Sequence, residues 1–188
     1  MERASESDVF DRRSALRLGG IAGAALTTGL VEARQRAHAQ TPTATGAMSI
    51  QKESISLATA QALLEAAQVK AEELGIPMGI AIVDEGGLLK ALHRMDGANS
   101  AVTIDLIQMK AYSAASFRTP THQIAEGVQE NPARAASLAN TPRFTLLGGG
   151  YPILDGEVVI GGIGVGGGSA EQDMEVAEAA LTAVGASF

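Results

Sequence analysis

The chain has 188 residues, with 14 Lys and Arg against 21 Asp and Glu, and a formal net charge of −7 at pH 7. Binding to nucleic acid or to an anionic membrane surface requires clustered Lys and Arg, so this acidic balance argues against both. The chain contains no Cys, which excludes disulfides, a thiol nucleophile and a thiolate metal site.

Residues 1–39 have the three parts of an export signal. Arg12-Arg13 precedes an uncharged stretch, 18–31, that is too short to span a membrane, and Ala37-His38-Ala39 has the small-x-small form of a signal-peptidase site. The paired arginines are similar to a twin-arginine signal. The alternative interpretation is an amphipathic N-terminal helix. The signal interpretation predicts that the mature chain is periplasmic or secreted.

The remainder is predicted to be a flexible tether followed by one domain. The tether, 40–53, begins with a Pro/Thr/Ala/Gly-rich stretch that lacks the apolar side chains needed for a core. The domain, 54–188, has the length of a single folded unit and contains no segment that could span a membrane.

Capping residues and apolar periodicity delimit the first half of the domain. Ser56 is predicted to cap a helix that ends at Gly75, and Pro77 prevents its continuation. A short apolar strand and its return strand follow, joined by a turn at 84–87, and then a second helix. These predicted elements are the strands 78–83 and 88–95 and the helix 101–117.

The second half is predicted to contain two short helical segments, three strands and a last helix. Thr121 is predicted to cap the first short helix, and Asp155-Gly156 predicts a tight hairpin. Ser169 and Gln172 form a capping box for the last helix. The predicted elements are the helical segments 121–126 and 131–138, the strand 144–147, the two strands of the hairpin around 155–156, and the helix 170–186.

The predicted order of elements, α-β-β-α-α-β-β-β-α, has no regular βαβ alternation. It therefore predicts an α+β fold in which helices cover an antiparallel sheet. With 2 Tyr, 4 Phe and no Trp, the core must consist mainly of Ala, Ile, Leu, Val and Met.

Gly162-x-Gly164-x-x-Gly167 matches the dinucleotide-binding fingerprint, but its context does not. That fingerprint requires a βαβ unit and an acidic residue about 20 positions downstream, and the chain ends too soon for both. One alternative is that the glycines permit close packing of a strand against a helix. Another is that the backbone amides of Gly167, Gly168 and Ser169 bind a ligand carboxylate at the start of the last helix.

Two histidines, one lysine and one arginine are the candidate side chains for a site. His93 and His122 lack the spacing of a zinc site, but one donor is enough for a haem iron, and His122 follows a predicted helix break. Each could equally be an ordinary hydrogen-bonded histidine. Lys110 is either solvated or in contact with an anionic group of a ligand. Arg94 pairs either with Asp96 or with a ligand carboxylate.

Three blocks of the sequence resemble the GlcG/HbpS-like family of haem-binding and glycolate-operon proteins. They are GIAIVDEGGLLKALHRMDGA at 79–98, QMKAYSAASFRTPT at 108–121 and GGGYPILDGEVVIGGIGVGGGSAEQD at 148–173. The resemblance extends to the C-terminal domain of some cobalamin adenosyltransferases. It implies a five-stranded antiparallel sheet flanked by helices, a homo-oligomer and, for exported members, a role in haem binding and redox sensing.

The first functional hypothesis is therefore an exported, oligomeric binding protein for haem or a related tetrapyrrole. An apolar cleft between the second helix and the sheet would hold the ring, His122 or else His93 would bind the iron, and Lys110 or Arg94 would meet a propionate.

The alternative is an enzyme or accessory subunit that acts on a small hydroxy or oxo carboxylic acid. Arg94 and Lys110 would bind its carboxylate, and Asp84 or Asp96 would act as the base. A third possibility is a structural partner of an exported oxidoreductase. No constellation in the sequence fixes a reaction.

Overall fold

The computed structural model describes residues 49–98 and 100–188, and residues 50–188 form one compact unit. The predicted export signal lies outside the described residues. In chain order the elements are α1 (Leu57–Leu74), β1 (Gly79–Asp84), β2 (Leu89–Arg94), α2 (Ala101–Phe117), α3 (Thr121–Gly127), α4 (Pro132–Ala139), β3 (Gly150–Asp155), β4 (Val158–Gly166) and α5 (Ala170–Val184). Among these elements no helix is both long and apolar enough to cross a membrane.

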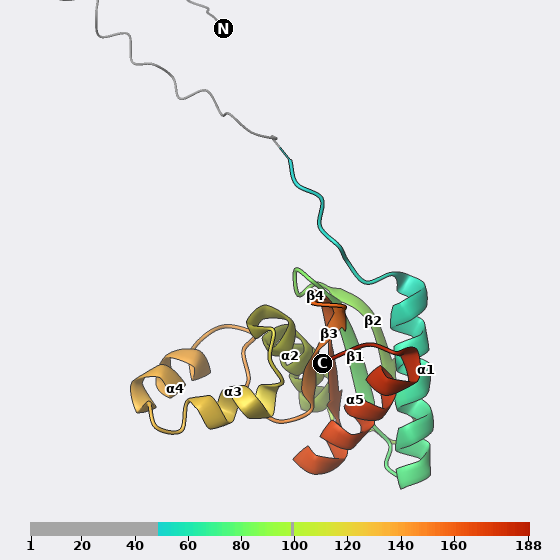
Figure 1. Cartoon of the computed structure of the whole chain (residues 1–188). Coiled ribbons are helices and arrows are strands. Elements are labelled where there is room, and N and C mark those ends of the chain that lie inside the picture. Colours follow the sequence, from blue (N-terminus) through green and yellow to red (C-terminus); the bar gives the residue numbers. More distant parts are fainter. Residues whose placement is uncertain (1–48, 99) are drawn as a thin grey trace, which may run out of the picture. The chain divides into compact units, whose positions relative to one another are not determined.

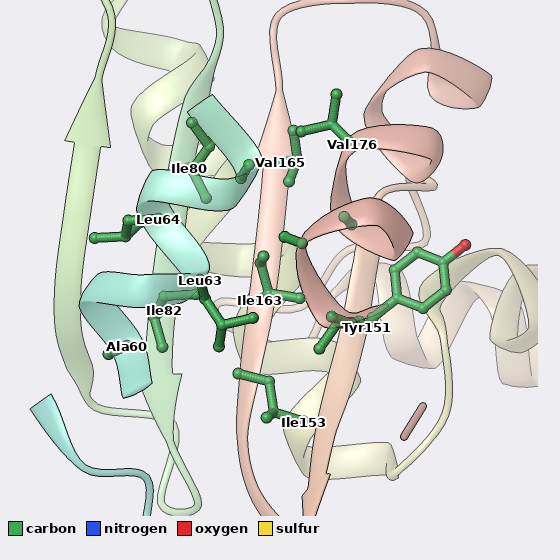
Figure 2. Close-up of a cluster of buried hydrophobic side chains, with 14 of the residues drawn as sticks. Ala60, Leu63, Leu64, Ile80, Ile82, Tyr151, Ile153, Ile163, Val165 and Val176 are labelled. Carbon is green, nitrogen blue, oxygen red and sulfur yellow. The ribbon is translucent and has the colours of Figure 1, made fainter. Parts of the chain in front are cut away.

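The four strands form one antiparallel sheet in the order β2-β1-β4-β3, with α1 and α5 on one face and α2 on the other (Figure 1). The main apolar core lies between the sheet and the α1–α5 layer. Ile80, Ile82, Ile163 and Val165 point from the central strands toward Leu63 and Val176, among others (Figure 2). Full burial of each large side chain of this kind contributes about 1.5–3 kcal/mol to stability.

On the other face of the sheet, β4 presents glycines, and α2 packs directly on the backbone of this strand. Gly162, Gly164 and Gly166 alternate along β4 and therefore share this face. A Cβ atom at Gly164 would overlap with the carbonyl oxygen of Ile107, and one at Gly162 with that of Ala111. Gly162 and Gly164 of the apparent dinucleotide fingerprint thus permit close strand–helix packing, which was one of the two alternatives.

The predicted caps of the two long outer helices and the predicted hairpin are confirmed. The Ser56 hydroxyl accepts a hydrogen bond from the Thr59 amide, and Gly75 ends α1 in the left-handed conformation. Ser169 and Gln172 form both bonds of the capping box at α5. The turn at Asp155-Gly156 joins β3 to β4 in antiparallel register.

The predicted five-stranded sheet is wrong, although the α+β class agrees with the structure. The sheet has four strands, because 144–147 forms no ladder. Phe144 and Thr145 are buried as a strand would require, but side-chain hydroxyls occupy the backbone donors. The Thr145 amide donates to Ser113 Oγ at 2.9 Å, and the Leu147 amide donates to Thr145 Oγ1 at 3.2 Å. The bond between Leu147 and Thr145 is local, and local bonds of this kind compete with strand pairing.

Thr121 begins α3 but does not cap it, which corrects that prediction. Its fully buried hydroxyl instead donates to the Leu147 carbonyl at 2.7 Å and accepts from the Gly150 amide at 3.1 Å. The helix thereby anchors the segment that enters β3. The following helix, α4, is capped by the Asn131 side chain, which accepts from the Arg134 amide, and none of its residues is buried.

Candidate functional site

A buried ion pair joins the middle of α2 to the first turn of α5. Lys110 Nζ lies 2.7 Å from Asp173 Oδ2 and donates a second hydrogen bond, of 2.8 Å, to the Val165 carbonyl. The other carboxylate oxygen of Asp173 accepts from the Gly168 amide at 3.0 Å. Both residues are only 4% exposed. Removal of one partner from such a pair leaves an uncompensated buried charge, which is strongly destabilising.

The environment of Asp173 shifts the pKa of its carboxyl. Burial raises the pKa of the Asp173 carboxyl above its ordinary value, and the hydrogen bonds and charge from Lys110 and Gly168 oppose that shift only in part. Perturbed carboxylates that face a cavity are typical of functional sites. The ion pair is therefore a candidate for binding or proton transfer as well as a structural element.

Glycines bring the backbone close to this ion pair and leave a cavity beside it. A Cβ at Gly149 would lie 2.7 Å from Asp173 Cβ and 3.2 Å from Lys110 Nζ. The cavity has a volume of about 320 Å³. Its lining consists of the ion pair and residues from α2, the 147–148 segment, the end of β4 and the start of α5: Thr103, Leu106, Lys110, Leu147, Gly148, Gly166, Gly167, Gly168, Ala170 and Asp173.

The structure brings together three of the residues proposed as binding residues from the sequence. Lys110, Gly167 and Gly168 line the cavity. Ser169 follows directly, but its hydroxyl caps α5 and bonds to Glu171. The expectation of a solvated Lys110 is wrong, because Lys110 is buried. The alternative, a lysine free to meet a ligand anion, needs revision, because Asp173 already occupies one of its donors.

Arg94 and the two histidines lie elsewhere on the sheet. Arg94 is exposed at the end of β2, in the cross-strand row that continues through Gly79 of β1 to Gly166 of β4. His93 also lies on β2, whereas His122 lies on α3 beside β3, so the histidines occupy opposite edges of the sheet. They cannot share one ligand site within a single chain.

Each histidine has a buried ring nitrogen without a partner in the described part of the chain. The Nδ1 atoms of His93 and His122 are both in this state. The His122 ring packs against Tyr151 with 5.7 Å between ring centroids, and the Tyr151 hydroxyl donates a short hydrogen bond to Glu178. Burial and this acceptor raise the Tyr151 pKa, so that the phenol stays protonated.

Other predicted features of the site are not present. The apolar cleft expected between the second helix and the sheet is absent along the middle of β4, where the backbone of α2 lies against the glycines, and the cavity beside Lys110 lies at the end of this contact. Asp84 Oδ1 accepts the amides of Gly86 and Leu88, which makes it part of the β1–β2 turn. Asp96 is exposed. Within the described residues no three His, Asp or Glu side chains gather into a metal site.

Asp173 is the functional candidate that the sequence did not reveal. It is one of two acidic residues in the first turn of the last helix. The one available signal was an acidic residue just after a glycine-rich turn and a capping box, which is ordinary at a helix N-terminus. Its partner is 63 positions away in the sequence, and only the fold brings the two together.

Comparison with known proteins identifies relatives across most of the chain. Residues 55–182 match the family described as haem degrading protein HbpS-like. The corrinoid adenosyltransferase PduO of Citrobacter freundii is 36% identical over 132 residues, which is 70% of this chain. The chain spans only 39% of the length of that relative.

Two solved structures share the fold. A PduOC:haem complex is 32% identical, with a TM-score of 0.66, and the match covers 71% of this chain and 97% of the other. A double mutant of HbpS from Streptomyces reticuli is 30% identical, with a TM-score of 0.67 and coverage of 74% and 93%. The resemblance to GlcG/HbpS proteins is thus confirmed. The chain belongs to the HbpS-like family.

Proposed function

We propose that this protein binds haem. The observation that carries the proposal is the haem complex of the relative PduOC. The match covers 97% of the PduOC chain at 32% identity. Exported haem sensing or handling, through a homo-oligomer, is the finer form of the same proposal. Its support is the pattern of an export signal in residues 1–39.

His122 is the residue of this chain that best fits a haem iron. A single imidazole is enough as a protein ligand to the iron. The side chain is half-buried, its Nδ1 has no partner in the described structure, and the Tyr151 ring packs against it. Haem, when bound, would supply its iron chemistry there, and the protein would position the imidazole and the apolar surroundings.

Two cavities of the domain do not suit a haem bound through His122. Neither the cavity beside Lys110 nor a second one, lined by Glu85 and Arg118 among others, includes a histidine. Their volumes of about 320 and 380 Å³ are near the lower end for drug-sized ligands. We therefore propose that the haem lies against the β3 edge of the sheet near His122, where a second copy of the chain would cover it.

Titration with haemin tests the proposal. We expect micromolar haemin to produce a shifted Soret band with the wild-type chain, and the His122→Ala variant to abolish the shift. His93→Ala is the matched control, because it removes a histidine at the opposite edge of the sheet, and it should retain the band. The absence of any shift with the wild-type chain would reject haem binding. Loss of the band in His93→Ala alone would reject His122 as the ligand.

A further inference from the structure

The cavity beside Lys110 and Asp173 has the features of a second ligand site, separate from His122. Two oppositely charged side chains, each 4% exposed, line a space of about 320 Å³ that the haem proposal does not use. Buried charges are costly unless they are fully paired, and here the pair faces a cavity where other groups can reach it. The donors and acceptors that lack a protein partner indicate which kind of ligand would fit.

Hydrogen-bond donors without a protein acceptor lie among the lining residues of the cavity. An ammonium has three N–H donors, and those of Lys110 reach two acceptors, Asp173 and the Val165 carbonyl. Both oxygens of Asp173 already accept hydrogen bonds. The Ala170 amide is the first of α5 and has no acceptor within the helix. Thr103, from α2, also lines the cavity, and a threonine side chain carries a hydroxyl donor.

A ligand for this cavity must therefore bring acceptors, and a negative charge suits its position. The positive end of the α5 dipole and the Lys110 ammonium both favour an anion. Leu106, Leu147 and the Ala170 methyl group supply apolar walls. We propose that the cavity binds a small monocarboxylate with a short apolar tail, whose oxygens accept from Lys110, Thr103 and Ala170.

The ion pair gives this site an unusual dependence on Asp173. Asp173 and the ligand carboxylate compete for the same ammonium, so Asp173 opposes binding while it holds Lys110 in place. Protonation of Asp173 removes that competition, and burial raises the pKa of its carboxyl. A cavity that bound neutral amides or alcohols would show no such competition.

Titration of the full chain with butanoate, followed through the amide resonances of residues 167–170, tests the proposal. Butanamide, which has nearly the same shape without the charge, should bind at least about tenfold more weakly. Lys110→Met should abolish binding. Asp173→Asn should strengthen it by about tenfold, since the competing carboxylate is gone.

A variant outside the ion pair tests the proposal even if Lys110→Met and Asp173→Asn fail to fold. Thr103→Val removes one hydroxyl without a change in the buried charges, and it should weaken butanoate binding about threefold to tenfold. Thr182→Val, the same change at an exposed position of α5 that does not line the cavity, should leave the affinity unchanged. Equal affinities for butanoate and butanamide, or an unchanged affinity in Thr103→Val, would overturn the proposal and leave the ion pair a purely structural element.

Discussion

At the scale of single residues, Lys110 is the best-defined feature of this protein. Its side chain is held by one carboxylate oxygen and one carbonyl, deep enough that bulk solvent hardly reaches it. Asp173 in turn depends on this ammonium for the stability of its charged form. The protonation of Asp173 therefore depends on the presence of Lys110.

The Lys110→Met variant should raise the pKa of Asp173 further, because burial would act without the opposing cation. A group whose folded pKa is raised contributes stability that is present below its unfolded pKa, about 3.9 for Asp, and lost as pH rises through the folded pKa. The free energy of unfolding should thus fall with rising pH over a wider range than in wild type.

Carbon-13 NMR of the Asp173 carboxyl measures the shift directly. Lys70→Met, which removes a lysine of α1 beside Glu175, is the matched control and should leave Asp173 unchanged. An unaltered Asp173 titration in Lys110→Met would contradict the coupling.

At the scale of elements, the packing of α2 on β4 places the site. The alternating glycines let the helix backbone lie directly on the strand, and Ala111 and Ala115 continue the same close contact. This close packing brings Lys110 within hydrogen-bond distance of the Val165 carbonyl on β4 and of Asp173 at the start of α5. Larger residues along this strand would hold α2 away from the sheet and pull the ion pair apart.

Gly164→Ala should lower the free energy of unfolding by about 1–3 kcal/mol or more, because the new methyl group overlaps with the Ile107 carbonyl. Urea unfolding measures the change as a lower midpoint with an unchanged slope. Gly127→Ala adds the same methyl group in α3, where no heavy atom lies within 4 Å, and should be neutral or slightly stabilising. Equal midpoints for the two variants would show that the α2–β4 contact is looser than described.

At the scale of the whole molecule, apolar side chains remain on the surface of the described unit. Val102 and Leu147 are 63% and 51% exposed, and Leu88 and Leu89 are 64% and 50% exposed on and beside the edge strand β2. The helix α4 buries none of its residues in this chain. Exposed apolar surface of this kind is typical of association sites.

We therefore predict that the 19.2 kDa chain forms a homo-oligomer in solution. Light scattering coupled to gel filtration should give a multiple of that mass at micromolar concentration, both with and without haemin. Leu89→Lys, which places a charge on the exposed edge of β2, should lower the mass if this edge takes part. A monomer under all conditions would contradict this prediction. It would also contradict the proposal that a second copy of the chain covers the haem near His122.

The sequence by itself determined the local structure of this protein. The Ser56 cap, the Ser169–Gln172 capping box, the Asp155-Gly156 turn and the span of α2 all depend on residues a few positions apart, whose hydrogen bonds form within one segment. The α+β class followed from the order of these local elements, and the family followed from the sequence blocks that contain them.

Only the tertiary structure decided the site. It paired Lys110 with Asp173 across 63 positions, and it put the two histidines at opposite edges of the sheet. It also turned a predicted fifth strand into a loop, because the Ser113 hydroxyl of α2 takes the amide of Thr145. Apolar periodicity records which side chains are buried, but it does not specify which distant donor or acceptor completes each hydrogen bond.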